Sequence, residues 1–529
     1  MAKRSRRWTA TLAVMGVAAA TLTGAAVAQT APTAQSVLQS LSRSMGADNL
    51  KCITYGGTIG YVGIVGQAHD ITSDWPKVLI SKYTRTINYD AKSSYEDRTI
   101  EQGNYPRGGG GGIPLQGQQR QQNYIVDKAA WNMQGNNANP QPDAADVRAI
   151  DIWMSPHGFI KGAMAPGANP VLITRYENGA VGTLAGHRYR KLNIISFTFG
   201  KYRINGTISE DNLLERVETR IANPVRGDLN YEAEYSQWKD VNGVKFPGNF
   251  HNHTDWDNET QPPNYNGGHN SFGLNVTDIR PNDCGQALTV PANVANAQPA
   301  AVTVTMQTLA PGVTYLTGGT HHSVAVEFND YIALVEAPLN QARTLAVFNF
   351  VRGMYPNKPI KYVVNSHNHF DHLGGIRTAF HEGATIITHR TNHDFYKNEV
   401  LSHETWSLEP DRLSLYPPTE YDEGYQFETV DSRYTLSDGT RNLDVLYMQG
   451  SPHAEGMVMV YLPKDKILIE ADVYTPLAAG AAPPATPPAA AVNLYDNIKA
   501  YKLDVTTIAG LHGRAVPWAD FLRFVSKPN

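Results

Sequence analysis

Cysteine is nearly absent from this chain. Its 529 residues include two, Cys52 and Cys284. In an oxidising compartment these thiols could pair, and a bridge would tie together the two ends of the segment that they bracket. A sequence does not reveal whether two cysteines lie close enough to bond. Both the bridged and the free state therefore remain open.

Long polar tracts, coiled-coil repeats and runs of basic residues are also lacking. Charged residues make up 18% of the chain, and the formal net charge is −4. A mildly acidic protein without a basic patch is a poor candidate for binding nucleic acid. The composition is that of a folded protein, and the length predicts two domains.

Beyond the N-terminus, no apolar run approaches the roughly 18 residues that cross a bilayer. The first 28 residues differ: a basic start from Lys3 to Arg7 precedes a small, apolar stretch and an Ala-Val-Ala cleavage site. This pattern predicts a secretory signal peptide over residues 1–28, cut before Gln29. Its removal takes away four positive charges and moves the net charge to −8. We expect a periplasmic or secreted protein without a membrane span.

Residues 31–284 are predicted to form a mainly antiparallel β domain. One amphipathic helix over residues 36–45 opens it, and apolar side chains then alternate with polar ones, for example in 195–199 and 229–235. Asn205-Gly206 and Asn242-Gly243 interrupt such runs and predict tight hairpins. The pattern resembles the curved half-barrels of periplasmic lipoprotein-carrier proteins, which implies a surface that could hold an apolar ligand.

Two further stretches of this half carry the signals of a site and of a domain boundary. Residues 251–255 read His-Asn-His-Thr-Asp and copy part of a metal motif, but Trp256 stands where a last histidine is needed. A polar strand face explains them better. Residues 285–302 are rich in Ala, Pro, Asn and Gln, which predicts a linker between two domains.

The densest group of metal-binding residue types lies in the second half. Residues 367–372 read His-Asn-His-Phe-Asp-His and directly follow the apolar run 360–364. Alternate histidines on an extended segment point the same way, so His367 and His369 can bind one ion together. Asp371 and His372 then turn away and can hold a second ion. Two glycines after them allow a tight turn into a helix.

Other candidate ligands each follow an apolar run that predicts a strand. His453 comes just past residues 443–448, Asp472 just past 466–469, and His512 just past 505–508. Strands that pack side by side bring the loops at their ends to one edge of a sheet. This repeated placement predicts that the three residues meet the 367–372 motif.

With these residues, the sequence over 303–529 resembles the metallo-β-lactamase fold superfamily. The resemblance implies a four-layer αββα sandwich of α+β class, with metals at one edge of its two sheets. It implies two zinc ions per chain. The ligands of the first ion would be His367, His369 and His453, and those of the second would be Asp371, His372 and His512. Asp472 would bridge the two ions. Glu336 stands where this family usually has Asp beside the ligands.

The resemblance also implies a mechanism. A water between the two ions loses its proton near neutral pH and attacks the substrate. Asp371 would orient this nucleophile and pass a proton to the leaving group. Tyr474 could donate a hydrogen bond to the oxyanion, or could be a packed core residue. One of His321 and His322 could line the pocket, and the Ala/Pro stretch 476–492 could be a mobile loop beside it.

The leading hypothesis is therefore a secreted zinc-dependent hydrolase that cleaves an ester, lactone, thioester or amide of a small molecule. Asp472 favours this over a β-lactam hydrolase, because true metallo-β-lactamases usually carry Cys or Ser at that position. The alternative is a mononuclear-iron oxidoreductase of the persulfide-dioxygenase type, since some relatives use the same motif for iron. A third hypothesis places the function in the first half, with an apolar ligand in its curved sheet.

Overall fold

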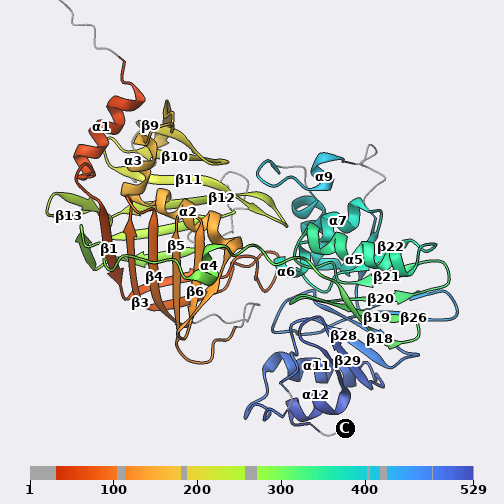
Figure 1. The fold of residues 1–529 in the computed structure, drawn as a ribbon. Coiled ribbons are helices and arrows are strands. Elements are labelled where there is room, and N and C mark those ends of the chain that lie inside the picture. Colours follow the sequence, from red (N-terminus) through yellow and green to blue (C-terminus); the bar gives the residue numbers. More distant parts are fainter. Residues whose placement is uncertain are drawn as a thin grey trace, which may run out of the picture.

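A computed structural model describes residues 31–103, 113–179, 188–255, 271–401, 405–417, 426–478 and 480–527. The chain builds one large antiparallel sheet in its first half and two smaller sheets in its second half (Figure 1). The predicted signal peptide, residues 1–28, lies outside the described residues. No helix in the described part of the chain is long and apolar enough to cross a membrane.

The first half forms a 15-stranded sheet in which every strand pair is antiparallel. Its path runs β7-β6-β5-β4-β3-β2-β16-β15-β12-β11-β10-β9-β8, and β1 pairs with β3 and β17. The strands are β1 (Cys52–Gly57), β2 (Ile59–Gly63), β3 (Lys77–Asn88), β4 (Ser93–Gln102), β5 (Gln119–Val126), β6 (Ala129–Gln134), β7 (Asn137–Pro140), β8 (Val171–Gly179), β9 (Arg188–Phe199), β10 (Tyr202–Ile208), β11 (Leu214–Asn223), β12 (Gly227–Ser236), β15 (Asn249–Thr254), β16 (Phe272–Asn275) and β17 (Asp278–Pro281).

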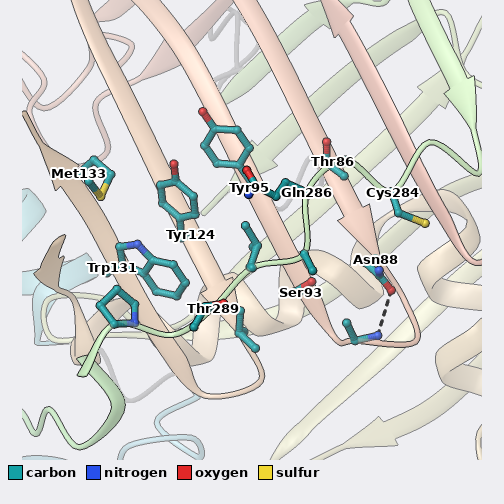
Figure 2. Close-up of a pocket in the computed structure, with 16 residues that line it drawn as sticks. Thr86, Asn88, Ser93, Tyr95, Tyr124, Trp131, Met133, Cys284, Gln286 and Thr289 are labelled. Atoms are coloured by element: carbon teal, nitrogen blue, oxygen red, sulfur yellow. Dashed lines mark hydrogen bonds between the residues drawn. The ribbon is translucent and has the colours of Figure 1, made fainter. Parts of the chain in front are cut away.

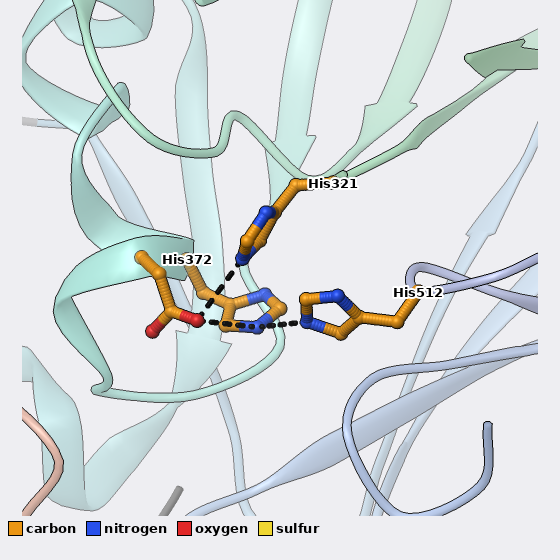
Figure 3. Close-up of side chains that lie close together, drawn as sticks. His321, His372 and His512 are labelled. Atoms are coloured by element: carbon orange, nitrogen blue, oxygen red, sulfur yellow. Dashed lines mark hydrogen bonds and ion pairs between the residues drawn. The ribbon is translucent and has the colours of Figure 1, made fainter. Parts of the chain in front are cut away.

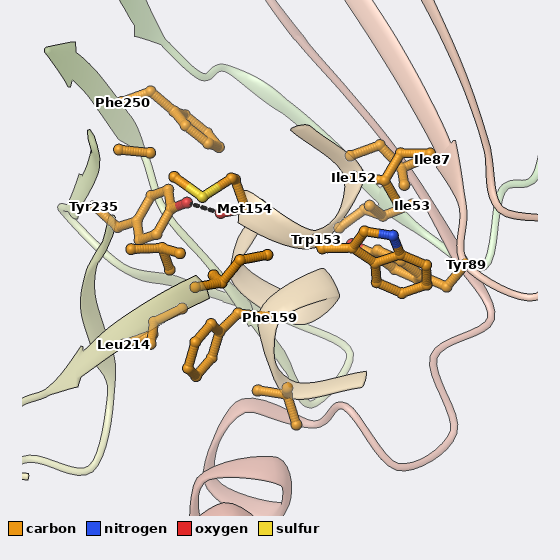
Figure 4. Close-up of a cluster of buried hydrophobic side chains, with 14 of the residues drawn as sticks. Ile53, Ile87, Tyr89, Ile152, Trp153, Met154, Phe159, Leu214, Tyr235 and Phe250 are labelled. Carbon is orange, nitrogen blue, oxygen red and sulfur yellow. Dashed lines mark hydrogen bonds between the residues drawn. The ribbon is translucent and has the colours of Figure 1, made fainter. Parts of the chain in front are cut away.

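This sheet curves around a short helical layer. Helix α1 (Ala34–Met45) confirms the predicted opening helix, and α2 (Ala145–Met154) and α3 (Pro156–Met164) pack against the sheet. Figure 4 shows Trp153 and Met154 of α2 and Phe159 of α3 among strand side chains such as Leu214 and Phe250. A cavity of about 370 Å³ remains between α2 and the strands.

The end of the first half is fastened back onto this sheet. Cys52 in β1 and Cys284 just past β17 form a disulfide, so the bridged state is the one observed. The following stretch, predicted as a linker, crosses the sheet over a hollow of about 670 Å³ beside Tyr95, Tyr124 and Trp131 (Figure 2). It contains the short helix α4 (Ala292–Ala295), where Asn293 Nδ2 donates to the carbonyl of Ala138.

One predicted hairpin turn is confirmed and the other is wrong. Asn242 and Gly243, with φ of 56° and 79°, join β13 (Lys239–Val241) to β14 (Val244–Phe246). Asn205-Gly206 lies instead in the middle of the continuous strand β10. Gly206 serves packing, because a Cβ there would lie 2.2 Å from Cζ of Phe159. A glycine selected for close packing looks like a turn glycine in sequence.

The second half forms two sheets that face each other. The seven-stranded sheet contains β18 (Thr305–Ala310), β19 (Val313–Thr317), β20 (Ser323–Glu327), β21 (Ile332–Val335), β22 (Ile360–Val364), β23 (Thr385–His389) and β24 (Phe427–Val430). The six-stranded sheet contains β25 (Arg433–Ser437), β26 (Asn442–Tyr447), β27 (Val458–Leu462), β28 (Ile467–Glu470), β29 (Thr507–Gly510) and β30 (Ala515–Pro517).

Helices cover the outer face of each sheet and complete four layers. In β21, Ile332 and Leu334 pack with helix α5 (Gln341–Met354), whereas Ala333 and Val335 face the other sheet. Helix α7 (Ile376–His381) joins α5, and α11 (Ala489–Ala500) and α12 (Trp518–Val525) cover the six-stranded sheet. The shorter helical turns are α6 (Phe370–Leu373), η1 (Pro142–Ala144), η2 (Arg390–Asn392), α8 (His393–Phe395), η3 (Tyr396–Val400) and α9 (Arg412–Leu415). The predicted αββα sandwich is confirmed.

The packing of Gly206 leads to a stability prediction. Gly206→Ala should lower the free energy of unfolding by about 1–3 kcal/mol, because the new methyl group overlaps the Phe159 ring. The same substitution at Gly353, where a new Cβ would have no atom from another part of the described structure within 4 Å, should instead stabilise helix α5 by about 0.5–1 kcal/mol. Thermal unfolding of both variants shows whether each substitution raises or lowers the free energy of unfolding. Equal effects at the two positions would contradict the packing explanation.

Candidate metal centre

The predicted ligands meet where four strands end. The 367–372 motif follows β22, His453 lies between β26 and β27, Asp472 follows β28 and His512 follows β29. Strands β28 and β29 are parallel neighbours, so their C-terminal ends place Asp472 and His512 at one edge. The convergence expected from the sequence is therefore observed.

One group of candidate ligands consists of His367, His369, His453 and Asp472, whose ligand atoms lie within 4.8 Å of one another. Asp472 Oδ2 is 3.1 Å from His453 Nε2 and 3.4 Å from His367 Nε2. The two histidine nitrogens are 3.3 Å apart. The His367 and His369 side chains are fully buried.

The second group contains Asp371, His372 and His512, and also His321. Figure 3 shows the three histidine rings converging on one carboxylate. His321 Nε2 lies 3.0 Å from Asp371 Oδ2, and His512 Nε2 lies 3.2 Å from His372 Nε2. His321 is thus the member of the His321-His322 pair that reaches the site, whereas His322 bonds to the carbonyl of Gly513.

Asp472 faces both groups at once. Its Oδ2 is directed to the first group, while Oδ1 lies 3.1 Å from His372 Nε2 and 2.5 Å from His512 Nε2. The residue has φ of 63°, in the left-handed region that few aspartates occupy. The turn directly after β28 therefore holds the carboxylate between the two sets of ligands, the place that the resemblance assigns to a bridging ligand.

Electrostatics separates the protonation states of these groups. Burial lowers the pKa of His367 to about 4 and that of His369 well below its usual value. Burial acts in the same direction on His372, but the Asp472 and Glu336 carboxylates outweigh it and raise the pKa of that ring. Burial alone would raise the pKa of Asp472, yet the surrounding histidines lower it well below its usual range. His367 and His369 thus offer neutral imidazoles beside the ionised carboxylate of Asp472.

Hydrogen bonds behind the ligands hold their outward nitrogens and leave the inward nitrogens facing the site. His372 Nδ1 lies 2.9 Å from Glu336 Oε2, and His367 Nδ1 lies 2.9 Å from Ser366 Oγ, which itself donates to Glu336. His369 Nε2 lies 3.0 Å from the carbonyl of Ala68. Its Nδ1 is buried and has no hydrogen-bond partner among the described residues. Such outward contacts fix the tautomer of a histidine that binds a metal.

The donor set therefore fits a borderline divalent cation. It offers imidazoles and carboxylates without a thiolate, which suits Zn²⁺ better than Mg²⁺ or Ca²⁺. The orphaned Nδ1 of His369 also fits, since a buried nitrogen without a partner is costly unless a ligand occupies it. Glu336, named from the sequence as a neighbour of the site, accepts hydrogen bonds from His372 and Ser366 despite being longer than the usual Asp.

Tyr474 does not join this cluster. Its ring is 3% exposed and packs against Phe521 and Phe524 of α12. The groups that act on its hydroxyl include Asp520 and Glu470, and burial raises its pKa to about 12. The structure therefore places Tyr474 in the core, the second of the two roles considered for it, and gives no support to an oxyanion contact.

Sequence reasoning missed one contribution to the site. A loop between β2 and β3 brings Gln67, Ala68 and His69 against the motif, and Gln67 Nε2 donates to Asp371 Oδ1 at 2.7 Å. These residues stand some 300 positions from the motif. No motif or periodicity in the sequence marks them.

Comparison with known proteins identifies the second half. The family described as "Metallo-beta-lactamase superfamily" matches residues 352–500. None of the curated proteins compared with this chain matches it.

Several solved structures are similar to the chain. A metallo-beta-lactamase from Pontibacter korlensis is 17% identical, covers 42% of this chain and is itself covered over 98%, with a TM-score of 0.32. FIM-1 from Pseudomonas aeruginosa, in its mono-zinc form, is 18% identical over 44% of this chain and 96% of its own, with a TM-score of 0.33. The enzyme from Hirschia baltica is 18% identical over 43% and 99%, with a TM-score of 0.30.

Because the TM-scores and sequence identities are low, these similarities do not indicate what this protein acts on. The family match covers α7, the 367–372 motif, His453 and Asp472, and it ends before His512. Residues 352–500 of this chain therefore match the metallo-beta-lactamase superfamily.

Proposed function

We propose that this protein is an exported dinuclear zinc hydrolase that cleaves an ester, lactone, thioester or amide bond of a small molecule. The observation that carries the proposal is the position of Asp472 between two sets of ligands. One carboxylate with each oxygen directed to a different set can hold two ions at a short separation. His367, His369 and His453 would complete the first set, and Asp371, His372 and His512 the second.

Zinc ions bound there would lower the pKa of a water molecule and polarise the carbonyl group of a substrate. Among the residues of this chain, Asp371 is positioned to accept the proton of a water molecule and to transfer it. Burial alone would raise its pKa, but the His321 hydrogen bond and the His372 ring lower it well below the usual value. An ionised Asp371, 29% exposed, can orient a water molecule, accept its proton and pass it to the leaving group.

A substrate screen combined with metal analysis tests this function. Purified protein would be assayed against ester, lactone, thioester, phosphodiester and β-lactam compounds, and its metal content measured. Hydrolysis with about two zinc ions per chain supports the proposal. Iron near one ion per chain, without hydrolysis, would support the persulfide-dioxygenase alternative instead.

Export is supported by two independent features. The first 28 residues have the composition of a signal peptide, and the Cys52–Cys284 bridge is of the kind that persists outside the cytoplasm. N-terminal sequencing of the protein from its native cells should begin at or near Gln29. A chain that retains Met1 and is recovered from the cytoplasm would contradict export.

Asp472→Ser should reduce zinc binding from about two ions to about one. The first set keeps three buried imidazoles, whereas the second keeps His372 with Asp371 and His512, which are 29% and 22% exposed and less firmly held. Zinc titration of metal-free protein gives the stoichiometry. The control is Asp504→Ser, at an exposed aspartate paired with Lys466. Two ions in both variants would contradict a bridging role.

Glu336→Ala should weaken zinc binding by about 10–100-fold without removing a ligand. The variant leaves His372 Nδ1 and Ser366 Oγ without their common acceptor, so the His372 ring loses its fixed orientation. Glu336→Asp keeps the carboxylate, and its zinc affinity should lie between that of the wild type and that of Glu336→Ala. Glu327→Ala, which removes a partner of Lys358 in the same sheet, serves as control and should bind zinc normally.

A further inference from the structure

The loop from residue 64 to 76 leaves the first sheet after β2 and rests on the metal motif. The amide of Phe370, between His369 and Asp371, donates to the carbonyl of Gly66 at 3.1 Å. Trp75 meets the Phe370 ring edge-on at 6.4 Å. Gly66 has φ of 76°, and a Cβ there would lie 2.3 Å from Phe370 Cγ. Glycine is therefore required for this close approach.

Gln67 and His321 contact different oxygens of the Asp371 carboxylate. Its side chain is 8% exposed, and Nε2 donates to Asp371 Oδ1 at 2.7 Å. Oε1 is buried and has no hydrogen-bond partner among the described residues. A glutamine that served only the packing of the loop would be expected to satisfy both ends of its amide. Here its one side-chain hydrogen bond is to a candidate ligand.

The next two residues hold other ligand-bearing segments. The carbonyl of Ala68 lies 3.0 Å from His369 Nε2 and accepts from Asn368 Nδ2 at 3.2 Å. His69 Nε2 lies 3.2 Å from the carbonyl of Ser451, and the Glu455 amide donates to the His69 carbonyl at 2.6 Å. Ser451 and Glu455 flank His453 on both sides. Three consecutive residues of the first sheet's loop thus contact the surroundings of three candidate ligands.

We propose that the metal centre is built by both halves of the chain, with Gln67 as a positioning residue for Asp371. This proposal rests on the proposed zinc site and deepens it. A charge-assisted hydrogen bond from a buried amide keeps the carboxylate in one orientation, so that its other oxygen stays beside His321 and His372. The first half of the chain therefore supplies part of the zinc site, and the site is incomplete without it.

Gln67→Met in the full-length protein tests this role. Methionine fills a similar volume but cannot donate, so zinc affinity at the second set should fall by about 10–100-fold. The kcat should fall as well, while KM changes less than about twofold, because Gln67 positions a ligand and does not bind substrate. Gln67→Glu, which has the same length but places a negative charge beside Asp371, should weaken zinc binding further.

Gln118→Met is the matched control. Gln118 is an exposed residue directly before β5 of the first sheet, and its Nε2 also donates to a carboxylate at 2.7 Å, that of Glu101. This variant should keep wild-type zinc affinity and kcat. Wild-type zinc affinity and kcat in Gln67→Met would overturn the proposal.

Gly66→Ala provides a second variant that leaves every polar group in place. It should displace the loop from Phe370 and weaken zinc binding. Gly117→Ala has the same backbone strain, with φ of 75°, but no described atom lies within 4 Å of its new Cβ. Gly117→Ala should bind zinc normally. Equal zinc affinity in the two alanine variants would contradict the role proposed for the loop of residues 64–76.

The two proposals fail in distinguishable ways. If the wild-type chain binds two zinc ions but hydrolyses none of the screened substrates, the proposed function is wrong. The role of Gln67 is judged separately, by the ratio of zinc affinities between Gln67→Met and Gln118→Met.

Discussion

The structure of the C-terminal part depends on one constraint, the burial of the Asp472 carboxylate among imidazole rings. Each of its oxygens lies within 3.4 Å of two histidine nitrogens, in a left-handed turn directly after β28. A buried charge is tolerated only where opposite or polar groups surround it. The histidines can surround it only if β22, β26, β28 and β29 all end at the same edge, so the register of both sheets is tied to this one side chain.

A second layer of carboxylates stands behind the ligands and sets their states. Glu336 is fully buried at φ of 73° and accepts hydrogen bonds from His372 and Ser366. Glu470, at the end of β28, is also buried, and desolvation together with the charge of Asp472 raises its pKa to about 8. Asp472 and Glu336 therefore outweigh burial at His372 and raise the pKa of that ring, whereas burial dominates at His367 and lowers its pKa to about 4.

Among the described residues, the first half of the chain reaches this site through the loop between β2 and β3. Its large sheet has its own core and a disulfide that closes β1 onto the segment after β17. The loop between β2 and β3 can contact the motif because Gly66 lets the backbone lie flat on Phe370, which puts Gln67 and Ala68 beside Asp371 and His369. The two halves thus contact each other beside the candidate metal centre, which is the physical basis of the role proposed for the first half.

The sequence by itself determined the features that depend on local patterns. Apolar runs located β22, β26, β28 and β29, and the placement of His367, His453, Asp472 and His512 after them predicted their convergence. Such patterns are readable because each strand must bury its own side chains. Only the tertiary structure decided contacts between distant segments. Gly206 makes room for the Phe159 ring and does not form a turn, and Tyr474 packs on α12. His321, and not His322, reaches Asp371, and Gln67 holds the same carboxylate. These depend on how separate elements pack in space, and no short stretch of sequence carries that information.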